Sequence, residues 1–248
     1  MPDTPPLIIS EREIRTHGPG RALAVCWRQW LAERRLAKRG IHFRDTDPGK
    51  VAAAYGAMSP AEFDTINGRQ DWANWRTIPR ALCGHVPNRP LRILDLGCGT
   101  GSSTRVLAWY APAGSHITAY EIAEPLLEIA KSRDCRHASG TSACVDFALQ
   151  GVTEALRQPD GNLIPDNSVD AVNASGVVGH HLNDSTVLPL IEELNRVLRQ
   201  GGIAMLDVGP SLKENDLRLL MEAADFIYEG HYRSGWWDPT GQVVFRTK

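Results

Sequence analysis

Short apolar runs alternate with segments of helical period from about Leu91 to the end of the chain. This alternation is typical of a parallel sheet covered by helices. Between the fourth and fifth runs, apolar residues from Val187 to Leu198 recur at helical spacing, Pro189 fits only in the first turn, and Gly201-Gly202 is expected to end the helix. The pattern predicts strands at residues 92–96, 116–121, 144–149, 168–174 and 202–208, and a closing antiparallel pair near 226–233 and 242–245, joined by a turn at 238–241.

Helical signals dominate the segment before residue 85. Leu23, Trp27, Trp30 and Leu31 form an amphipathic stripe. The sequence Ser59-Pro60-Ala61-Glu62 is a capping box with proline at the first helical position, and Asn67-Gly68 breaks the helix that it starts. A second helix is expected to follow. The chain therefore divides, by pattern, into a helical cap at 1–85 and an α/β domain at 86–248.

Composition adds few constraints. The 248 residues carry a net charge of −2, and the sequence pI is about 6.4, as in an ordinary globular protein. A basic run near residues 28–39 permits a nucleic-acid or membrane surface but is more typical of a solvated helix face. The five cysteines form no CxxC pair, so we expect reduced thiols. The start MPDTPPLIIS lacks the features of a signal peptide, and no apolar run is long enough to cross a membrane, so we expect a cytoplasmic protein.

The stretch LRILDLGCGTGSST, from Leu91 to Thr104, combines a strand, closely spaced glycines and a helix start. Such a loop lets a ligand touch the bare backbone. A dinucleotide is expected to place its pyrophosphate there, but Asp95 at the end of the strand would repel it. A ligand that carries positive charge, such as S-adenosylmethionine, fits better. The next strand ends in Glu121, whose carboxylate can accept two hydrogen bonds from a ribose diol, although that feature alone also suits NAD.

Taken in order, DLGCGTG, AYE, LIPDNSVDAV and RVLRQGG resemble the class I S-adenosylmethionine-dependent methyltransferases, over roughly the last two thirds of the chain. The resemblance implies a Rossmann-like sheet of order 3-2-1-4-5-7-6, with the cofactor over the ends of strands one, two and four. It also implies that S-adenosylmethionine is held by residues of the glycine loop and of the second strand end: Asp95, Gly97, Cys98, Gly99 and Gly101 beside the methionyl and ribose part, Glu121 on the ribose hydroxyls and Ile122 on the adenine.

The chain departs from the family after the third strand. An acidic residue usually contacts the adenine amine there, whereas this sequence has Gln150-Gly151-Val152. Gln150 can accept the same hydrogen bond through its carboxamide oxygen, or backbone groups and apolar packing at Val152 recognise the adenine.

Two histidines follow the fourth strand, where the family places the transferable methyl group. His180 or His181 is a candidate general base for the acceptor, or else only fixes the loop by hydrogen bonding. Tyr55, in the cap, is a further candidate at the methyl site. We predict no metal, because the two histidines have no third ligand at suitable spacing.

The cap supplies the candidate substrate-binding residues. Trp72 and Trp75 are candidates for an aromatic roof over the sulfonium, and Arg76, with Arg69 and Arg80, for an arginine fork on a carboxylate. Packing of the cap and surface ion pairs are the alternatives.

The helical cap favours a methyltransferase with a small-molecule acceptor that is methylated at O, N or C. An RNA or protein methyltransferase is the alternative, but the pI of about 6.4 makes nucleic acid an unexpected partner, and no Asn-Pro-Pro-aromatic motif of base-amine methylation is present. A non-catalytic cofactor-binding partner protein is a third possibility. We expect no membrane partner and a monomer or homodimer.

Overall fold

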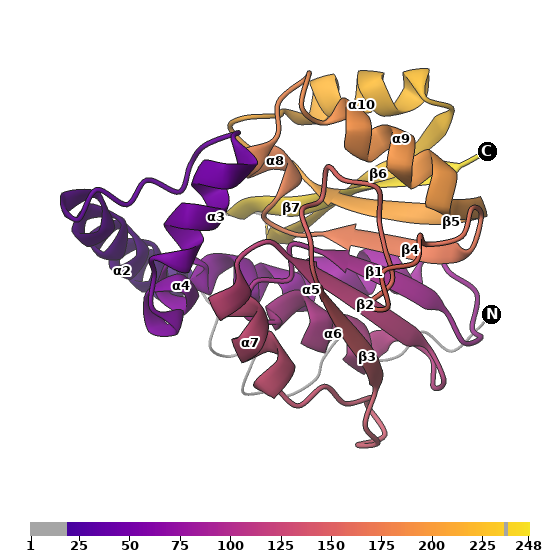
Figure 1. Cartoon of the computed structure of the whole chain (residues 1–248), viewed down its shortest axis with the longest axis horizontal. Helices are drawn as coiled ribbons and strands as arrows, with labels where there is room; N and C mark the ends of the chain where they lie inside the picture. The colour runs from indigo at the N-terminus through magenta and orange to yellow at the C-terminus, as the bar shows by residue number, and fades with distance from the viewer. Residues whose placement is uncertain (1–18, 236–237) are drawn as a thin grey trace.

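A mixed sheet forms the centre of the computed structural model, which describes residues 19–235 and 238–248 (Figure 1). Its strand order is β3-β2-β1-β4-β5-β7-β6, and β7 runs antiparallel to β5 and β6. Both the order and the antiparallel closing pair confirm the prediction. The strands are β1 (Arg92–Leu96), β2 (His116–Glu121), β3 (Cys144–Leu149), β4 (Val169–Ala174), β5 (Leu198–Asp207), β6 (Phe226–Gly235) and β7 (Asp238–Thr247).

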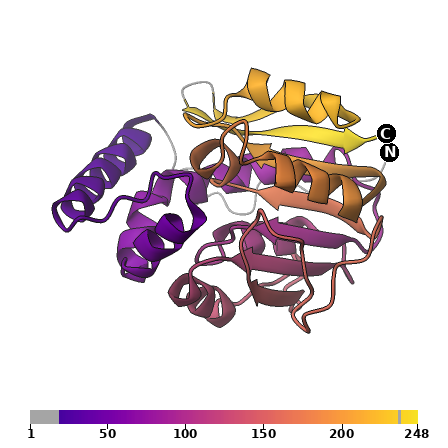
Figure 2. The same ribbon diagram turned by 45° about the horizontal axis from the view of Figure 1, so that its top comes forward.

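Helices cover both faces of the sheet (Figures 1 and 2). Side chains of a strand alternate between the faces, so Ile93 of β1 packs in one hydrophobic cluster and Leu94 in the other. The cluster around Ile93 holds residues of α5 (Gly68–Cys83) and α6 (Ser102–Tyr110), and α7 (Glu124–Ser132) packs on the same face at β2 and β3. The opposite cluster is closed by α9 (Leu188–Val197) and α10 (Glu214–Ala223).

Two local predictions were wrong. Gly201-Gly202 does not end a helix: α9 already ends at Val197, and β5 begins at Leu198 and runs through both glycines. The predicted turn at 238–241 lies inside β7, because Asp238 already pairs with Gly235 of β6. Pro239 is tolerated there because it lies beyond the last residue pair of β5 with β7, where its missing N–H costs no hydrogen bond to β5.

The helices α2 (Pro19–Lys38), α3 (Pro48–Gly56) and α4 (Pro60–Ile66) lie beyond one end of the sheet, on the left in Figure 1. The capping box at Ser59 is confirmed, because its hydroxyl accepts the N–H of Glu62 while the Glu62 carboxylate accepts the N–H of Ser59. By contrast, the apolar stripe on α2 is largely exposed, with Leu23 at 72% and Trp27 at 62% of full exposure.

The apolar contacts of α2 lie on its other side, where Leu36 packs with Met58 and Ile66.

The helix α5 packs directly on the sheet through Ile78 and Leu82, although it precedes residue 85. No helix in the described part of the chain is both long and apolar enough to cross a bilayer.

Candidate functional site

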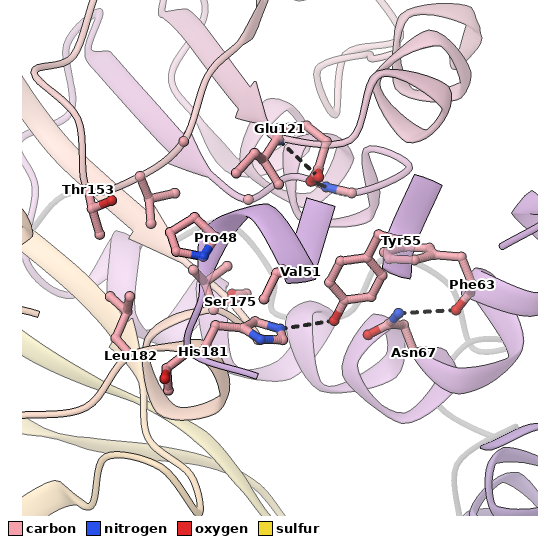
Figure 3. A pocket seen from close by; sticks show the side chains of 18 residues that line it. Pro48, Val51, Tyr55, Phe63, Asn67, Glu121, Thr153, Ser175, His181 and Leu182 are labelled. Atoms are coloured by element: carbon pink, nitrogen blue, oxygen red, sulfur yellow. Dashed lines mark hydrogen bonds between the residues drawn. The ribbon is translucent and has the colours of Figure 1, made fainter. Parts of the chain in front are cut away.

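Three neighbouring cavities lie where the N-terminal helices meet the carboxyl ends of β1, β2 and β4. The first has a volume of about 760 Å³, part of it open to solvent, and is lined by Glu121, Ile122, Val152 and Thr153 from the sheet side and by residues of α3 and α4 (Figure 3). The second, about 630 Å³, follows the glycine loop. The third, about 590 Å³, lies beside the loop after β4. Asn67 lines all three, so this side chain marks their junction.

The glycine loop brings bare backbone to the first two cavities. Gly97 and Gly99 have φ angles of 67° and 55°, which other residues rarely adopt. A Cβ atom on Gly97 would lie 2.3 Å from Val177 Cγ2, and one on Gly99 would lie 2.5 Å from Phe63 Cζ. Both positions therefore require glycine, and the loop touches the segment after β4 as well as the cap.

Gly101 and Asp95, also predicted beside the cofactor, line none of the three cavities. Gly101 caps α6 and faces the backbone of Ala130 on α7. The Asp95 carboxylate is fully buried and accepts hydrogen bonds from Ser103 Oγ at 2.8 Å and Thr104 Oγ1 at 2.6 Å, and from Asn173 Nδ2. Burial raises the pKa of Asp95, and these hydrogen bonds oppose the rise. Its carboxylate thus ties the end of β1 to α6 and β4.

Glu121 lies at the carboxyl end of β2 and lines the first cavity, as predicted (Figure 3). Its carboxylate accepts the N–H groups of Gly99 at 2.8 Å, Ile122 at 3.0 Å and Ala123 at 2.9 Å. Burial raises its pKa, and these three donors act in the opposite direction. Since a carboxylate offers about four lone-pair sites, the fixed group retains capacity for a further donor.

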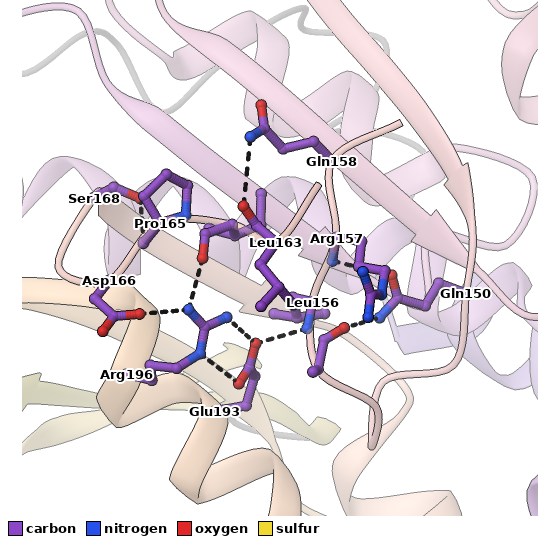
Figure 4. Close-up of polar contacts among 12 residues, drawn as sticks. Gln150, Leu156, Arg157, Gln158, Leu163, Pro165, Asp166, Ser168, Glu193 and Arg196 are labelled. Atoms are coloured by element: carbon purple, nitrogen blue, oxygen red, sulfur yellow. Dashed lines mark hydrogen bonds and ion pairs between the residues drawn. The ribbon is translucent and has the colours of Figure 1, made fainter. Parts of the chain in front are cut away.

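The loop after β3 presents Gly151, Val152 and Thr153 to the first cavity, but Gln150 turns away. Its Nε2 donates to Ala155 O at 2.9 Å and its Oε1 accepts the N–H of Arg157 at 3.1 Å, so the carboxamide serves its own loop (Figure 4). The hydrogen bond of this carboxamide to the adenine stays a prediction that these contacts do not favour, whereas the alternative, apolar packing, has side chains in place. Ile122 and Val152 supply apolar surface instead.

A carboxylate on β5 fixes the segment after β4. Asp207, 2% exposed, accepts the N–H groups of Val177 at 2.8 Å, Val178 at 2.9 Å and Gly179 at 3.0 Å. These bonds hold the start of α8 (Val178–His181), which carries both candidate histidines. The prediction did not include Asp207, although an acidic residue at the end of an otherwise apolar strand indicates a buried carboxylate that needs hydrogen-bond donors.

His181 is buried and contacts the cap through both ring nitrogens. Its Nδ1 lies 3.2 Å from Asp45 O, and its Nε2 lies 2.9 Å from the Tyr55 hydroxyl. A carbonyl oxygen only accepts, so Nδ1 carries the proton and Nε2 accepts from the hydroxyl. Burial lowers the pKa of His181 and raises that of Tyr55. Two of the three predicted catalytic candidates, Tyr55 and His181, therefore form a neutral pair on the wall shared by the first and third cavities.

The other candidates are divided between the cavities and the core. His180 lines only the third cavity, and Cys98 lines the second, where burial raises the pKa of its thiol. Trp72, Trp75 and Arg76 line none of the three.

The Arg76 guanidinium stacks 5.0 Å from the Trp72 ring, and Trp75 packs against the core between α5 and the sheet. Their predicted role in substrate binding is not supported by these positions. Of the arginine fork, Arg80 donates to Arg233 O at 3.3 Å and only Arg69 lines a cavity.

Asn67 was missed because Asn-Gly is an ordinary helix breaker. It does end α4, and its Nδ2 donates to Phe63 O at 3.1 Å (Figure 3). Nothing in the sequence around Asn67 indicates that the residue that ends α4 also lines three cavities. Among the residues that the structure describes, no cluster of three or more His, Cys, Asp or Glu side chains is arranged to hold a metal ion.

Residues 93–202 match the family model described as a methyltransferase domain. These residues therefore form a methyltransferase domain, and the strand order is that of the Rossmann-like fold that solved S-adenosylmethionine-dependent methyltransferases share.

Among its relatives, an uncharacterised protein of Synechococcus is 31% identical over 75% of this chain and 43% of that protein. Demethylmenaquinone methyltransferase of Clavibacter sepedonicus is 30% identical over 62% of this chain and 56% of that enzyme. The chain thus spans about half the length of these curated relatives. The structure of magnesium protoporphyrin IX methyltransferase from Synechocystis, with bound S-adenosylmethionine, has a TM-score of 0.54 at 16% identity and covers 77% of this chain and 85% of that one.

Proposed function

We propose that this protein transfers the methyl group of S-adenosylmethionine to a small-molecule acceptor. The observation that carries the proposal is the first cavity, where a buried, backbone-anchored Glu121 carboxylate stands beside bare glycine backbone and apolar Ile122 and Val152. A ribose diol needs such an acceptor, and an adenine ring needs such apolar walls. These residues fit the adenosine part of S-adenosylmethionine.

The second cavity fits the methionyl part. It continues from the first along Gly97 and Gly99, and its wall includes the carboxylates of Asp64 and Asp71 and the amide of Asn74. Acidic and amide oxygens suit an ammonium group. Arg105 and Arg133 also line this cavity and suit the carboxylate at the same end of the molecule.

The third cavity is then left for the acceptor. It shares Tyr55, His181 and Gly176 with the first cavity, so an acceptor there faces the pair of polar side chains. A cavity lined by residues of α2, α3, α4, α5 and the loop after β4 suits a small molecule better than an open surface would. We infer that residues 1–85 act as a cap that completes the site.

S-adenosylmethionine supplies an electrophilic methyl group on a positively charged sulfur. The chain's own residues hold the acceptor and accept its proton. Nε2 of the neutral His181 ring accepts a hydrogen bond from the Tyr55 hydroxyl. When the Tyr55 oxygen takes a proton from the acceptor, the hydroxyl's own proton can therefore pass to Nε2. The cap excludes water from this contact.

Calorimetric titration with S-adenosylmethionine, S-adenosylhomocysteine and NAD tests the cofactor assignment. Glu121→Ala is expected to weaken binding of the first two by about 1.5–3 kcal/mol, because charge-assisted hydrogen bonds are lost. Glu128→Ala, at an exposed carboxylate of α7 that pairs with Lys131, is the matched control and should leave the affinity unchanged. Binding of NAD alone, or equal affinities in both variants, would refute the assignment.

A further inference from the structure

We propose that the outward face of α2 binds the surface of an anionic lipid membrane. The helix lies at the end of the molecule farthest from the sheet, on the left of both ribbon views (Figures 1 and 2). Its 20 residues extend over about 30 Å, enough to lie along a bilayer surface. The inference goes beyond the proposed function, because the side chains that carry it line none of the three cavities.

The apolar part of this face is aromatic and exposed. Leu23, Trp27 and Trp30 follow one another at intervals of four and three residues, so they lie on one side of the helix. Their exposed fractions are 72%, 62% and 43%. The two indole rings stack with their centroids 5.1 Å apart. Leu36, on the opposite side of α2, makes the apolar contacts with the rest of the cap, so the exposed stripe is available to a partner.

The same face continues into basic side chains. Arg34 and Lys38 extend the stripe at helical spacing. Arg28 and Arg35 are exposed beside it. The Arg34 guanidinium lies 4.5 Å from the centroid of the Trp30 ring, so the cationic and aromatic parts form one surface. Tryptophan and leucine on one stripe with arginine and lysine beside them are typical of a helix that lies in the headgroup region of a membrane.

The charge of α2 favours an anionic bilayer over other partners. The sequence of the helix contains five basic residues and one acidic residue, Glu33, whose carboxylate lies 2.8 Å from Arg44 outside the helix. A second copy of this chain would bring the same positive charge to the contact, which disfavours that pairing. A nucleic acid offers phosphates, but it offers no apolar phase for Leu23. A bilayer with anionic lipids offers both negative charge and an apolar interior.

This proposal replaces the expectation of no membrane partner. That expectation rested on the lack of an apolar run long enough to cross a bilayer, and a helix that lies in the surface needs no such run. The sequence left the basic run open to a membrane surface, and the exposure of the aromatic stripe beside it now favours that alternative.

Co-sedimentation of the whole chain with lipid vesicles tests the proposal. Vesicles of phosphatidylcholine alone are compared with vesicles of phosphatidylcholine and phosphatidylglycerol in equal parts, at low and at high salt. We expect binding to the anionic vesicles only, and weaker binding at high salt. The double variant Arg34→Gln, Arg35→Gln should bind about fivefold more weakly for each cation removed. The double variant Trp27→Ser, Trp30→Ser should bind about tenfold or more weakly, because the apolar anchor is lost.

The matched control is the double variant Arg218→Gln, Leu219→Ser on α10, where an exposed leucine also stands next to an arginine. It should bind as the unmodified protein does, and urea unfolding checks that each variant is folded. No vesicle binding, equal binding without anionic lipid, or unchanged binding of both α2 variants would overturn the inference. Binding of a single-stranded RNA but not of vesicles, or a dimer that the tryptophan variant dissociates without any vesicle binding, would assign the face to a nucleic acid or a second copy instead.

Discussion

The imidazole of His181 is held neutral by the protein around it. Burial disfavours the imidazolium, and the hydroxyl of Tyr55 donates to Nε2, where a second proton would have to bind. A neutral imidazole is the form that can accept a proton. The Tyr55 hydroxyl and the buried surroundings therefore keep His181, on the shared cavity wall, in the form that can accept a proton.

Tyr55→Phe is expected to raise the pKa of His181, because the donor that stabilises the neutral imidazole is lost. Titration of the His181 ring resonances by NMR, assigned with His181→Gln, measures the change. A pKa that falls instead would mean that Nε2–H donates to the tyrosine oxygen, and the proton path proposed above would then be wrong.

Burial of neutral His181 also makes stability depend on pH. Its folded pKa lies below the ordinary value of 6.5, so the unfolded chain binds more protons below that value. The free energy of unfolding should therefore fall as the pH drops below about 6.5. Urea unfolding at about pH 7.5 and 5.5 should show a smaller pH effect in His181→Gln than in the unmodified protein. Equal pH effects would show that this histidine is not destabilising when protonated.

At the scale of elements, Asp207 connects β5 to α8. Its carboxylate accepts three backbone N–H groups at the start of α8, which have no carbonyl partner within the helix. Asp207→Ala should lower the free energy of unfolding by about 2–4 kcal/mol, since buried donors lose a charged acceptor. Asp134→Ala, at an exposed carboxylate paired with Arg136, should change it by less than about 0.5 kcal/mol. Similar urea midpoints for both variants would contradict this account.

Local sequence patterns predicted helices and strands well where residues close in sequence determine the structure. The strand β1 was predicted to the residue because a buried apolar run leaves little choice, and the start of α4 because the capping box at Ser59 is a contact between neighbours. The turn at 238–241 failed because pairing with β6 outweighs the turn propensity of Asp-Pro-Thr-Gly. The stripe on α2 has helical period but is exposed, and periodicity alone does not reveal this.

At the scale of the whole molecule, the candidate site was predictable only in part. Gly97, Gly99 and Glu121 lie at the first cavity because strand ends and glycine turns follow from local sequence. Asp95 and Gln150 have the expected chain position, but their side chains turn to partners that only the folded chain provides. At the cap, Asn67 lines all three cavities and the predicted tryptophans line none of them, which again depends on how the helices pack in the folded chain.

The first cavity is lined both by helices of the cap and by strand ends of the sheet, so a cofactor bound in it as proposed would link the two parts. Pro48, Val51 and Tyr55 of α3 and Phe63 of α4 line the same cavity as Glu121 of β2, so a nucleoside bound as proposed would contact both parts. A ligand that binds only the folded state at a hundred times its Kd adds about 2.7 kcal/mol of stability. We therefore expect this stabilisation to reach the helices of the cap as well as the strand ends.

Hydrogen exchange with and without S-adenosylhomocysteine measures that coupling. Peptides that cover 48–67 should exchange more slowly in the complex, whereas a peptide within 226–235, on the edge strand β6, serves as the unaffected reference. At the same ligand concentration, Glu121→Ala should lose the protection of 48–67 although none of those residues is altered, because the variant no longer holds the nucleoside against α3. Protection confined to the strand ends, with 48–67 unchanged, would show that the helices before β1 do not close over the cofactor and that the acceptor is bound by some other part of the chain.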